Sequence, residues 1–321
     1  MPGYGQEGRV GISFQNSYGT ANTASMHWLP NVSESIALSK PPLISEGMRG
    51  INDDGIHYEG ANVIGGDLVI EATAIPLGVF LTAALGSPTT VTSGAVQTHA
   101  FLPLTADAQP LCAQRPFTTH KYFGIGSADT FSDMNGTTLE LGISNGELLT
   151  ATLGTVGGTE GRASAIAASY FNGKHFTWDN SSVSIAGAAI SDIAQMTITV
   201  DNALEAMHTL NNSKYPSRIK RQGFRTVTVG GTVKFASSSE YQSFIDQTER
   251  RLLMHFQGAT EVQSGYNESL TLDIPGLRMT EFAPQAGGPG EIEVSFSAKG
   301  VYDVTSAYSI KATLVNTIAG Y

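Results

Sequence analysis

Three short patterns in the sequence have the spacing of chemical sites, and the most specific is Gly142-x-Ser144-x-Gly146. Serine hydrolases use this spacing to hold a nucleophilic serine on a sharp turn between a strand and a helix. Here Asn145-Gly146 is a strong hairpin signal, and the apolar residues that follow it from Leu148 to Leu153 are typical of a strand. The pattern therefore favours a β-hairpin, and a hydrolase that uses Ser144 is kept as an alternative.

The other two patterns are binding motifs without the context that they need. Gly3-x-Gly5-x-x-Gly8 matches a dinucleotide fingerprint, but no strand precedes it. Asn52-Asp53-Asp54-Gly55 lacks the alternating acidic positions of a Ca²⁺ loop and favours a turn. The seven histidines show no metal-ligand spacing, and the single cysteine, Cys112, excludes a multi-thiolate metal site. We therefore predict no enzyme activity, no catalytic residue, no cofactor and no metal.

The charge balance excludes a protein whose main task is to grip nucleic acid. The formal net charge of the 321 residues is −10, whereas binding to phosphates needs a basic face. Charged residues make up 14% of the chain against roughly 25% in an average soluble protein, so we expect much of the surface to contact other protein. One local basic run favours contact with an acidic partner subunit over phosphate, because it lacks interleaved aromatic residues. Its residues are Arg218, Lys220, Arg221 and Arg225.

Most of the chain reads as short strands in which apolar and polar residues alternate. The clearest apolar sets are Leu139/Leu141/Ile143, Met196/Ile198/Val200, Leu270/Leu272/Ile274 and Ile292/Val294/Phe296. Helical spacing occurs twice, near 76–85 and, after the capping box Ser237-x-x-Glu240, near 238–249. No run of 18 apolar residues and no export signal is present, so we expect no membrane contact and assembly in the cytoplasm.

The two predicted helices follow similar sequences and indicate an internal repeat. Gly65-Gly66 precedes the first helix and Gly230-Gly231 the second, an offset of 165 residues. We therefore predict a mainly β protein with two tandem copies of one β-sheet domain, each with one short helix. The predicted organisation is an extended N-terminal arm over 1–33, a first domain over 34–155, a linker over 156–169 and a second domain over 170–321.

Several segments resemble the tail tube proteins of long-tailed, siphovirus-like bacteriophages and prophages. The resemblance is carried by Tyr18–Pro30 (YGTANTASMHWLP), Leu38–Glu46 (LSKPPLISE), His57–Asn62 (HYEGAN) with Gly65-Gly66, and more generally by Val200-Asp-Asn202 and the helix after Ser237. It covers most of the chain and its motifs are structural. It implies a tail-tube-like β-sandwich or partial barrel with a flanking helix in each domain.

The resemblance also implies partners and a location. Tube subunits form rings that stack around a channel for DNA, so we expect a virion protein that binds itself, the tape measure protein and other tail proteins. With two domains in each chain, three chains would make a pseudo-hexameric ring. DNA would pass through the lumen without specific binding. The alternatives are a tail-tip, hub or other virion β protein of related fold, and a carbohydrate-binding or adhesion module.

Two sets of residues are candidates for these roles. The arm has apolar side chains that could anchor on a neighbouring subunit, and they are Phe14, Tyr18, Met26, Trp28 and Leu29. Polar positions opposite the apolar faces of the strongest strands are candidates for the lumen wall. They are Thr138, Glu140, Thr197, Thr199, Thr271, Asp273, Glu291 and Glu293.

Overall fold

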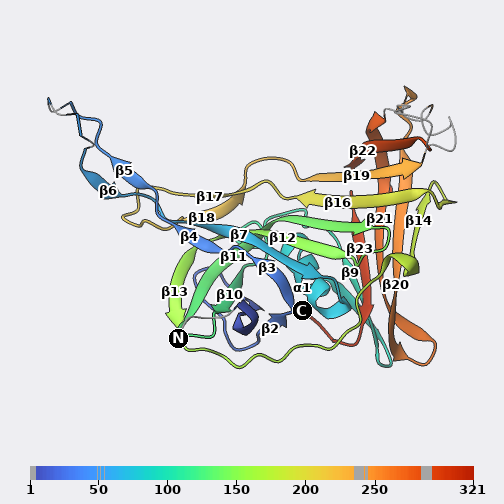
Figure 1. Cartoon of the computed structure of the whole chain (residues 1–321), viewed down its shortest axis with the longest axis horizontal. Coiled ribbons are helices and arrows are strands. Elements are labelled where there is room, and N and C mark those ends of the chain that lie inside the picture. The colour runs from blue at the N-terminus through green and yellow to red at the C-terminus, as the bar shows by residue number, and fades with distance from the viewer. Residues whose placement is uncertain are drawn as a thin grey trace.

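A computed structural model describes residues 5–48, 50, 52, 53, 55–234, 242, 245–282 and 291–321. Strands make up 56% of the chain, so the fold is mainly β, as the alternation of apolar and polar residues predicts. Most strands belong to one 19-stranded sheet, and two hairpins stand apart from it (Figure 1). Within the described residues the structure has one α-helix, α1 (Ala74–Leu85), which lies among the strands.

The first half of the chain forms antiparallel neighbours in the order β2–β1–β10–β11–β12–β7. Strands β3 and β4 pair with β7, and β13 pairs with the start of β11. The bounds are β1 (Arg9–Phe14), β2 (His27–Leu29), β3 (Asn31–Glu34), β4 (Ala37–Ser39), β7 (Val63–Glu71), β10 (Phe117–Tyr122), β11 (Ala128–Ser144), β12 (Thr150–Gly157) and β13 (Thr159–Ala163).

The second half has the order β15–β14–β20–β21–β22–β19, again antiparallel. Strand β16 pairs with β19, and β23 pairs with the start of β21. The bounds are β14 (Ser181–Ile185), β15 (Ala188–Ile190), β16 (Ile193–Asp201), β19 (Thr226–Lys234), β20 (Arg250–Gln263), β21 (Tyr266–Phe282), β22 (Glu293–Val301) and β23 (Lys311–Asn316).

The two pairing orders are the same, and two register shifts fall at equivalent places, although the β20–β21 ladder has two more shifts, after Gln257 and after Glu261, that the β10–β11 ladder lacks. The register between β10 and β11 shifts after Phe117, at the first pair of that ladder, and the register between β20 and β21 shifts after Arg250, also at the first pair. A second register shift follows Gly136 in the β11–β12 ladder, and another follows Met279 in the β21–β22 ladder. Each of these two bulges is a specific feature of one ladder, so the two halves are alike in these local details as well as in strand order.

The glycine pairs that indicate the repeat in the sequence are not equivalent in this correspondence. Gly65 is the third residue of β7, whereas Gly230 is the fifth residue of β19. The sequence therefore predicts the repeat with an alignment that is two residues out of register. Glycine is tolerated at many positions of a strand, so it does not define register by itself.

The two halves share one core. Strand β11 pairs with β16 of the second half, and β23 pairs with β9 (Val96–Phe101), which together with β8 (Thr89–Ser93) follows α1. Buried apolar side chains from Val10 to Leu314 form one continuous cluster. Burial of this size supplies the main favourable term for folding.

Helix α1 confirms the helix predicted near 76–85. Pro76 lies in its first turn and is buried, and the Gly86 N–H donates to the Thr82 carbonyl at 3.0 Å at its end. The helix is buried on nearly all sides, because it packs against strands of both halves; its apolar residues therefore do not form one stripe. The helix predicted near 238–249 falls largely outside the described residues.

Each half also carries a hairpin between equivalent strands. Strands β5 (Pro42–Ile44) and β6 (His57–Glu59) lie between β4 and β7, while β17 (Leu204–Met207) and β18 (Arg218–Arg221) lie between β16 and β19. Figure 1 shows the β5–β6 hairpin projecting from the body at one end of the long axis. Two short 3-10 helices, η1 (Gly5–Glu7) and η2 (Trp178–Asn180), complete the described elements.

Two segments of the predicted organisation contain strands. Within residues 5–33 of the predicted extended N-terminal arm, β1 pairs with β10 on one side and β2 on the other, and β3 begins at Asn31. The stretch 156–169 is not only a linker, because it contains the end of β12 and all of β13. In both segments Gly, Ser and Ala dilute the apolar pattern and the strand partners lie elsewhere in the chain, so the sequence carries little strand signal there.

Candidate functional site: a polar sheet face and two strand edges

Six adjacent strands, β7–β12–β11–β16–β19–β22, form a sheet with one apolar and one polar face. Leu139, Leu141, Ile198 and Val200 point into the core and are buried. The residues between them are rich in threonine, serine and glycine and are partly or fully exposed. This sheet crosses from the first half to the second at the β11–β16 ladder, so the polar face is shared by both halves.

Four of the predicted wall residues lie together on this face. Glu140 is exposed and pairs across the sheet with Thr152 on β12 and Thr199 on β16. Neighbouring rows carry Thr138 opposite Asp201 and Gly142 opposite Thr197. Side chains of one face lie close across antiparallel strands, so these residues form one continuous polar surface.

The charges of the polar face are divided between the two halves. Asp67 and Glu140 are exposed on β7 and β11, whereas Lys299 on β22 and Arg278 on β21 stand opposite one another across their ladder. The row that contains Glu140 continues through Thr199 and Thr228 to Lys299. The face is therefore acidic towards β7, whereas towards β21 Lys299 stands beside Arg278, whose charge is offset by an ion pair with Glu249.

The remaining wall candidates lie in two other settings. Glu293 pairs with Lys234 at the end of the β19–β22 ladder, and the exposed Glu291 carboxylate forms an ion pair with the same lysine at 2.5 Å. Its hydrogen bond with the Lys234 ammonium lowers the pKa of Glu291. These two carboxylates thus lie beside a cation at the end of the face.

Thr271 and Asp273 lie on the part of β21 that pairs with β20 and β23, which runs across the direction of β16 and β19 (Figure 1). Asp273 is 7% exposed and accepts hydrogen bonds from Arg251 at 2.6 and 2.8 Å and from the Tyr308 hydroxyl at 2.7 Å. Burial raises the pKa of Asp273, but the bonds from Arg251 and Tyr308 outweigh it and leave the pKa below its usual value. The structure thus separates this neutralised carboxylate from the Glu140 surface.

Three of the five arm residues are buried in their own chain. Leu29 is fully buried, the Trp28 ring meets His120 edge-on at 5.7 Å, and Phe14 meets Phe117 at 6.2 Å. Tyr18 and Met26 are partly exposed, and burial beside Asp133 raises the pKa of Tyr18 to about 12. The alternation Val10-Gly-Ile12-Ser-Phe14 is the signal that would have predicted β1.

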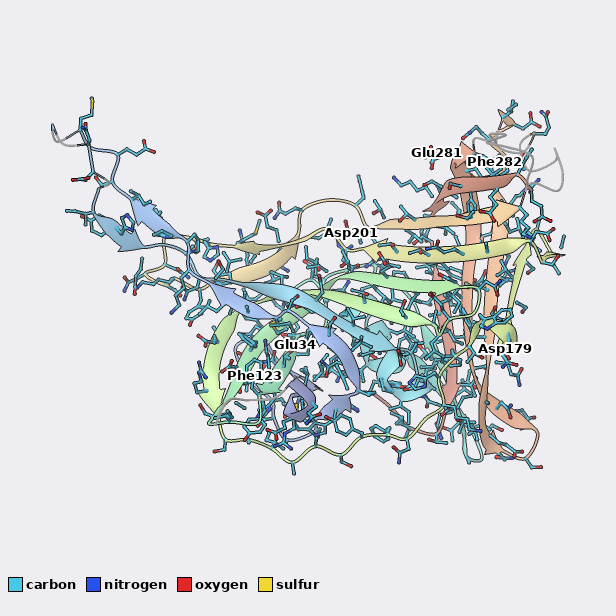
Figure 2. All side chains as sticks on the ribbon, in the orientation of Figure 1. Glu34, Phe123, Asp179, Asp201, Glu281 and Phe282 are labelled. Carbon is cyan, nitrogen blue, oxygen red and sulfur yellow. The ribbon has the colours of Figure 1, made fainter. Side chains whose placement is uncertain are left out.

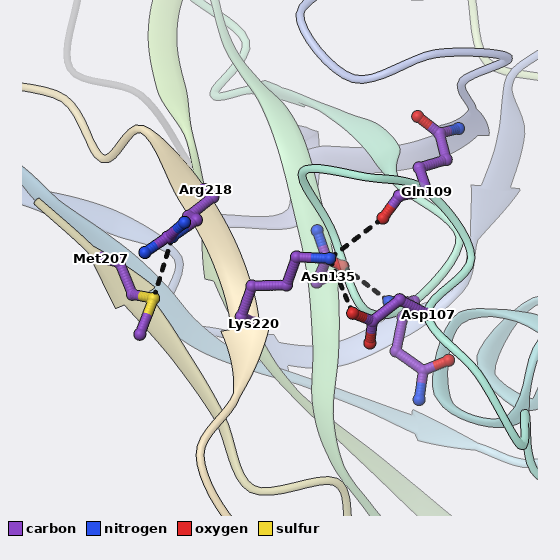
Figure 3. A network of polar contacts seen from close by, with 7 residues as sticks. Asp107, Gln109, Asn135, Met207, Arg218 and Lys220 are labelled. Carbon is purple, nitrogen blue, oxygen red and sulfur yellow. Dashed lines mark hydrogen bonds and ion pairs between the residues drawn. The ribbon is translucent and has the colours of Figure 1, made fainter.

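The basic run joins the two halves of one chain. Figure 3 shows Lys220 on β18, whose ammonium lies 2.6 Å from the Asp107 carboxylate and donates to the Gln109 carbonyl at 3.2 Å. Next to it, the Ile219 N–H donates to the Leu111 carbonyl at 2.9 Å. The expected acidic partner of Lys220 is therefore supplied by the same chain.

Arg225, the last residue of that run, belongs to a buried network around Asn202. The Asn202 amide donates to the carbonyls of Ala84 and Gly136 at 2.8 and 3.1 Å and accepts from the Arg225 guanidinium at 2.8 Å. Burial lowers the pKa of Arg225 to about 10, and the charge of Arg221 adds to this effect. Asn202 thus connects the end of β16 to the end of α1.

A group of exposed apolar side chains lies on the β5–β6 hairpin, which sequence reasoning did not select. Leu43 is 61% exposed, Tyr58 is 59% exposed and Ile44 is 44% exposed. Leu43 and Tyr58 are register partners across the hairpin. Such a cluster marks a surface that contacts another molecule. The sequence feature that could have indicated this surface is the apolar pair Leu43-Ile44, because no apolar strand was predicted nearby that would cover it.

The serine-hydrolase pattern around Ser144 lies in a β-hairpin, not in a turn between a strand and a helix. Ser144 ends β11, and Gly146 has a positive φ of 84° in the predicted hairpin turn, so no helix follows the serine. An open cleft of about 340 Å³ beside that turn is lined by Trp178, Asp179 and residues of β14 and β16. Among the described residues no group of three His, Cys, Asp or Glu side chains is arranged to hold a metal ion. No helix in this part of the chain is long and apolar enough to cross a membrane.

The family described as phage tail tube protein matches residues 5–300, which is most of the chain. No curated protein matches.

Proposed function

Because this chain belongs to the phage tail tube protein family, we propose that it is the subunit that polymerises as stacked rings around a channel for DNA. The family makes it a structural component of a phage virion. In our proposal it assembles in the host cytoplasm, acts without catalysis or cofactor, and contacts the tape measure protein and other tail proteins.

One observation carries the proposal: a single sheet runs through both halves and presents a polar face of small residues. A tube needs a wall whose strands continue from one domain to the next, and the β11–β16 ladder is such a continuation. Threonine, serine and glycine side chains give a wall without the rows of lysine and arginine that would retain phosphates. Glu140 and Asp67 add repulsion where they are exposed.

The matching pairing orders support two copies of one domain in each chain, with three chains in a pseudo-hexameric ring. On strand connectivity we propose residues 9–163 for the first copy and 181–316 for the second. In that arrangement β1 and β2 belong to the first copy and are equivalent to β14 and β15 of the second. Of the five candidate arm residues, only Tyr18 and Met26 are partly exposed and could contact a neighbouring subunit.

Electron microscopy of the purified chain tests the proposal. We expect long hollow tubes whose end-on projections show a ring with six similar densities, and a mass per ring equal to three chains. Single rings that never stack would favour a tail-tip or hub protein. Dispersed monomers under all conditions would overturn the proposal.

A further inference from the structure

The open cleft beside the Asn145-Gly146 turn has no part in the proposed tube wall. Its volume of about 340 Å³ lies in the range of small-molecule sites. Three segments form its sides: the turn after β11, the 3-10 helix η2 with the start of β14, and the start of β16. Met196 and Met254 also line it and are buried, so its inner end is apolar.

Backbone hydrogen bonds hold these segments around the cleft. The Asn145 N–H donates to the Ala194 carbonyl at 3.0 Å, which ties the turn to the start of β16. The Trp178 N–H donates to the Glu147 carbonyl at 3.3 Å, which ties η2 to the residue after the same turn. The cleft therefore exists before a ligand arrives, and a site formed in advance loses less entropy on binding.

The indole of Trp178 is available to a ligand in this cleft. Trp178 lines the cleft and is 46% exposed, whereas Trp28, the other tryptophan of the chain, is 4% exposed. An indole offers a large apolar surface with a negative π face. The C–H groups on one face of a sugar ring are apolar and carry small positive partial charges, so they stack on such a surface.

Polar side chains surround this indole. Asn145 and Gln195 line the cleft and are exposed, and within the described residues their amides form no hydrogen bond. The same holds for the hydroxyls of Ser182 and Ser191. Each amide has both donors and an acceptor, and each hydroxyl is both donor and acceptor. Such groups match the hydroxyls of a sugar, which also donate and accept.

The charge of the lining selects the class of ligand. Among the described residues that line the cleft, Asp179 is the only one with an ionisable side chain. Phosphates and carboxylates are held by arginine or lysine, so the lining is unsuited to an anion. A quaternary ammonium would use the indole and Asp179 but would leave the amides and hydroxyls without a role. A neutral ligand with many hydroxyl groups uses all of them.

We propose that this cleft binds a neutral sugar, with one face of the ring on the Trp178 indole and its hydroxyls bonded to Asn145, Gln195 and Asp179. The inference goes beyond the proposed function, because it concerns the chain whether or not the chain is assembled. Hydrolysis of a glycoside uses a pair of carboxyl groups, and the described lining supplies one. The cleft therefore binds a sugar without cleaving it.

Ligand-observed NMR on the purified chain tests the site, with glucose, galactose, mannose and N-acetylglucosamine as separate probes. We expect at least one of them to bind, and its affinity to fall at least tenfold in Trp178→Ala. Trp178→Phe should retain most of the affinity, because it keeps an aromatic face. Phe123→Ala is the matched control and should bind like the wild type. Phe123 is also 46% exposed, and Figure 2 shows it on the opposite side of the body from Asp179.

Tryptophan fluorescence gives a second readout. The bound sugar should shift the emission of the exposed Trp178 and leave that of the buried Trp28 unchanged. The response should therefore disappear in Trp178→Phe, although this variant still binds. If Trp178→Ala does not fold, Gln195→Ala carries the test, because its side chain is exposed. Gln195→Ala should weaken binding about fivefold, which corresponds to the loss of one hydrogen bond.

Glucuronate and choline test the class of ligand. Both should bind less tightly than the neutral sugar, because the lining has no cation for the carboxylate and choline has few groups for the amides. Tighter binding of either probe than of every neutral sugar would overturn the assignment. Failure of all four sugars to bind the folded chain, or equal losses in Trp178→Ala and Phe123→Ala, would also overturn it. Neither result bears on tube formation, which electron microscopy measures separately.

Discussion

Replacement of Asn202 by alanine tests whether the buried amide ties the second half of the chain to α1. The side chain is fully buried and makes three hydrogen bonds, to the Ala84 carbonyl, the Gly136 carbonyl and the Arg225 guanidinium. The Ala84 carbonyl lies in the last turn of α1, where carbonyls have no partner within the helix. Asn202→Ala leaves all three groups without this partner in a region that is closed to water.

The expected cost follows from typical hydrogen-bond energies. Two neutral bonds contribute about 1 kcal/mol each and the bond to a charged group about 1.5–3 kcal/mol, so the free energy of unfolding should fall by about 4 kcal/mol. An unfolding entropy of about 2.1 cal/mol/K per residue, scaled to this chain, converts this loss to a decrease of about 6 °C in melting temperature.

The assay is equilibrium unfolding in urea and calorimetry of the unassembled chain. Asn180→Ala is the matched control, because Asn180 is exposed, and it should change the free energy by less than about 0.5 kcal/mol. Asn202→Asp should be as damaging as alanine, because a carboxylate cannot donate to the two carbonyls. A loss below about 1 kcal/mol for Asn202→Ala would refute the reasoning.

Three further predictions concern assembly, pH and the channel. Leu43→Asp on the exposed β5–β6 hairpin should abolish tube formation, measured by sedimentation, with no change in melting temperature. Val304→Asp is the control, because Val304 is also exposed but lies in a turn outside that hairpin, and it should still assemble. Equal behaviour of the two variants would contradict a role of the hairpin in assembly. The pKa of Asp273 is lower in the folded chain than in the unfolded chain, where it is about 3.9. The ion pair with Arg251 therefore stabilises the fold at pH values above the unfolded pKa, and this stabilisation is lost as the pH falls through the folded pKa. Asp273→Asn should therefore be less stable than wild type at pH 7 and equal to it at the acid end of a urea titration series, and a constant difference would be inconsistent with this linkage. Glu140→Lys should leave tubes intact but slow DNA ejection from phage that carry the variant. High salt should restore the ejection rate, because added ions reduce the Debye length below its physiological value of about 8 Å. Ejection of the variant at the wild-type rate would exclude an electrostatic role for Glu140.

Local periodicity determined the strands that form the core. The alternation in Leu139/Leu141/Ile143, Met196/Ile198/Val200 and Leu270/Leu272/Ile274 predicts half-buried strands, and the structure has β11, β16 and β21 at these positions. The Asn145-Gly146 turn and the helix that begins near Pro76 were also predictable. Each of these signals lies within a few residues, where the side-chain period and the turn residues act directly on the backbone.

The likeness of the two halves was visible in the sequence only in outline. The Gly65-Gly66 and Gly230-Gly231 pairs indicate two related halves, but their alignment is two residues out of register. The register is set by ladders with distant strands, such as β7 with β12, and a side chain as small as glycine carries little information about them.

The environment of individual site residues was decided by the tertiary structure. Glu140 and Asp273 look alike in the sequence, since each stands between apolar residues of a strand. Asp273 is neutralised because β20 brings Arg251 beside it and a loop adds Tyr308, whereas Glu140 has threonines on both sides.

The amino-acid sequence by itself determined a mainly β chain with a repeated pattern, low charge and the resemblance to tail tube proteins, because composition and short periods are properties of the chain alone. Tertiary structure decided that Phe14 and Trp28 are buried, that Lys220 meets Asp107, and that Arg251 neutralises Asp273. These outcomes depend on which strands become neighbours, and that choice is made by burying one core with residues drawn from the whole length of the chain.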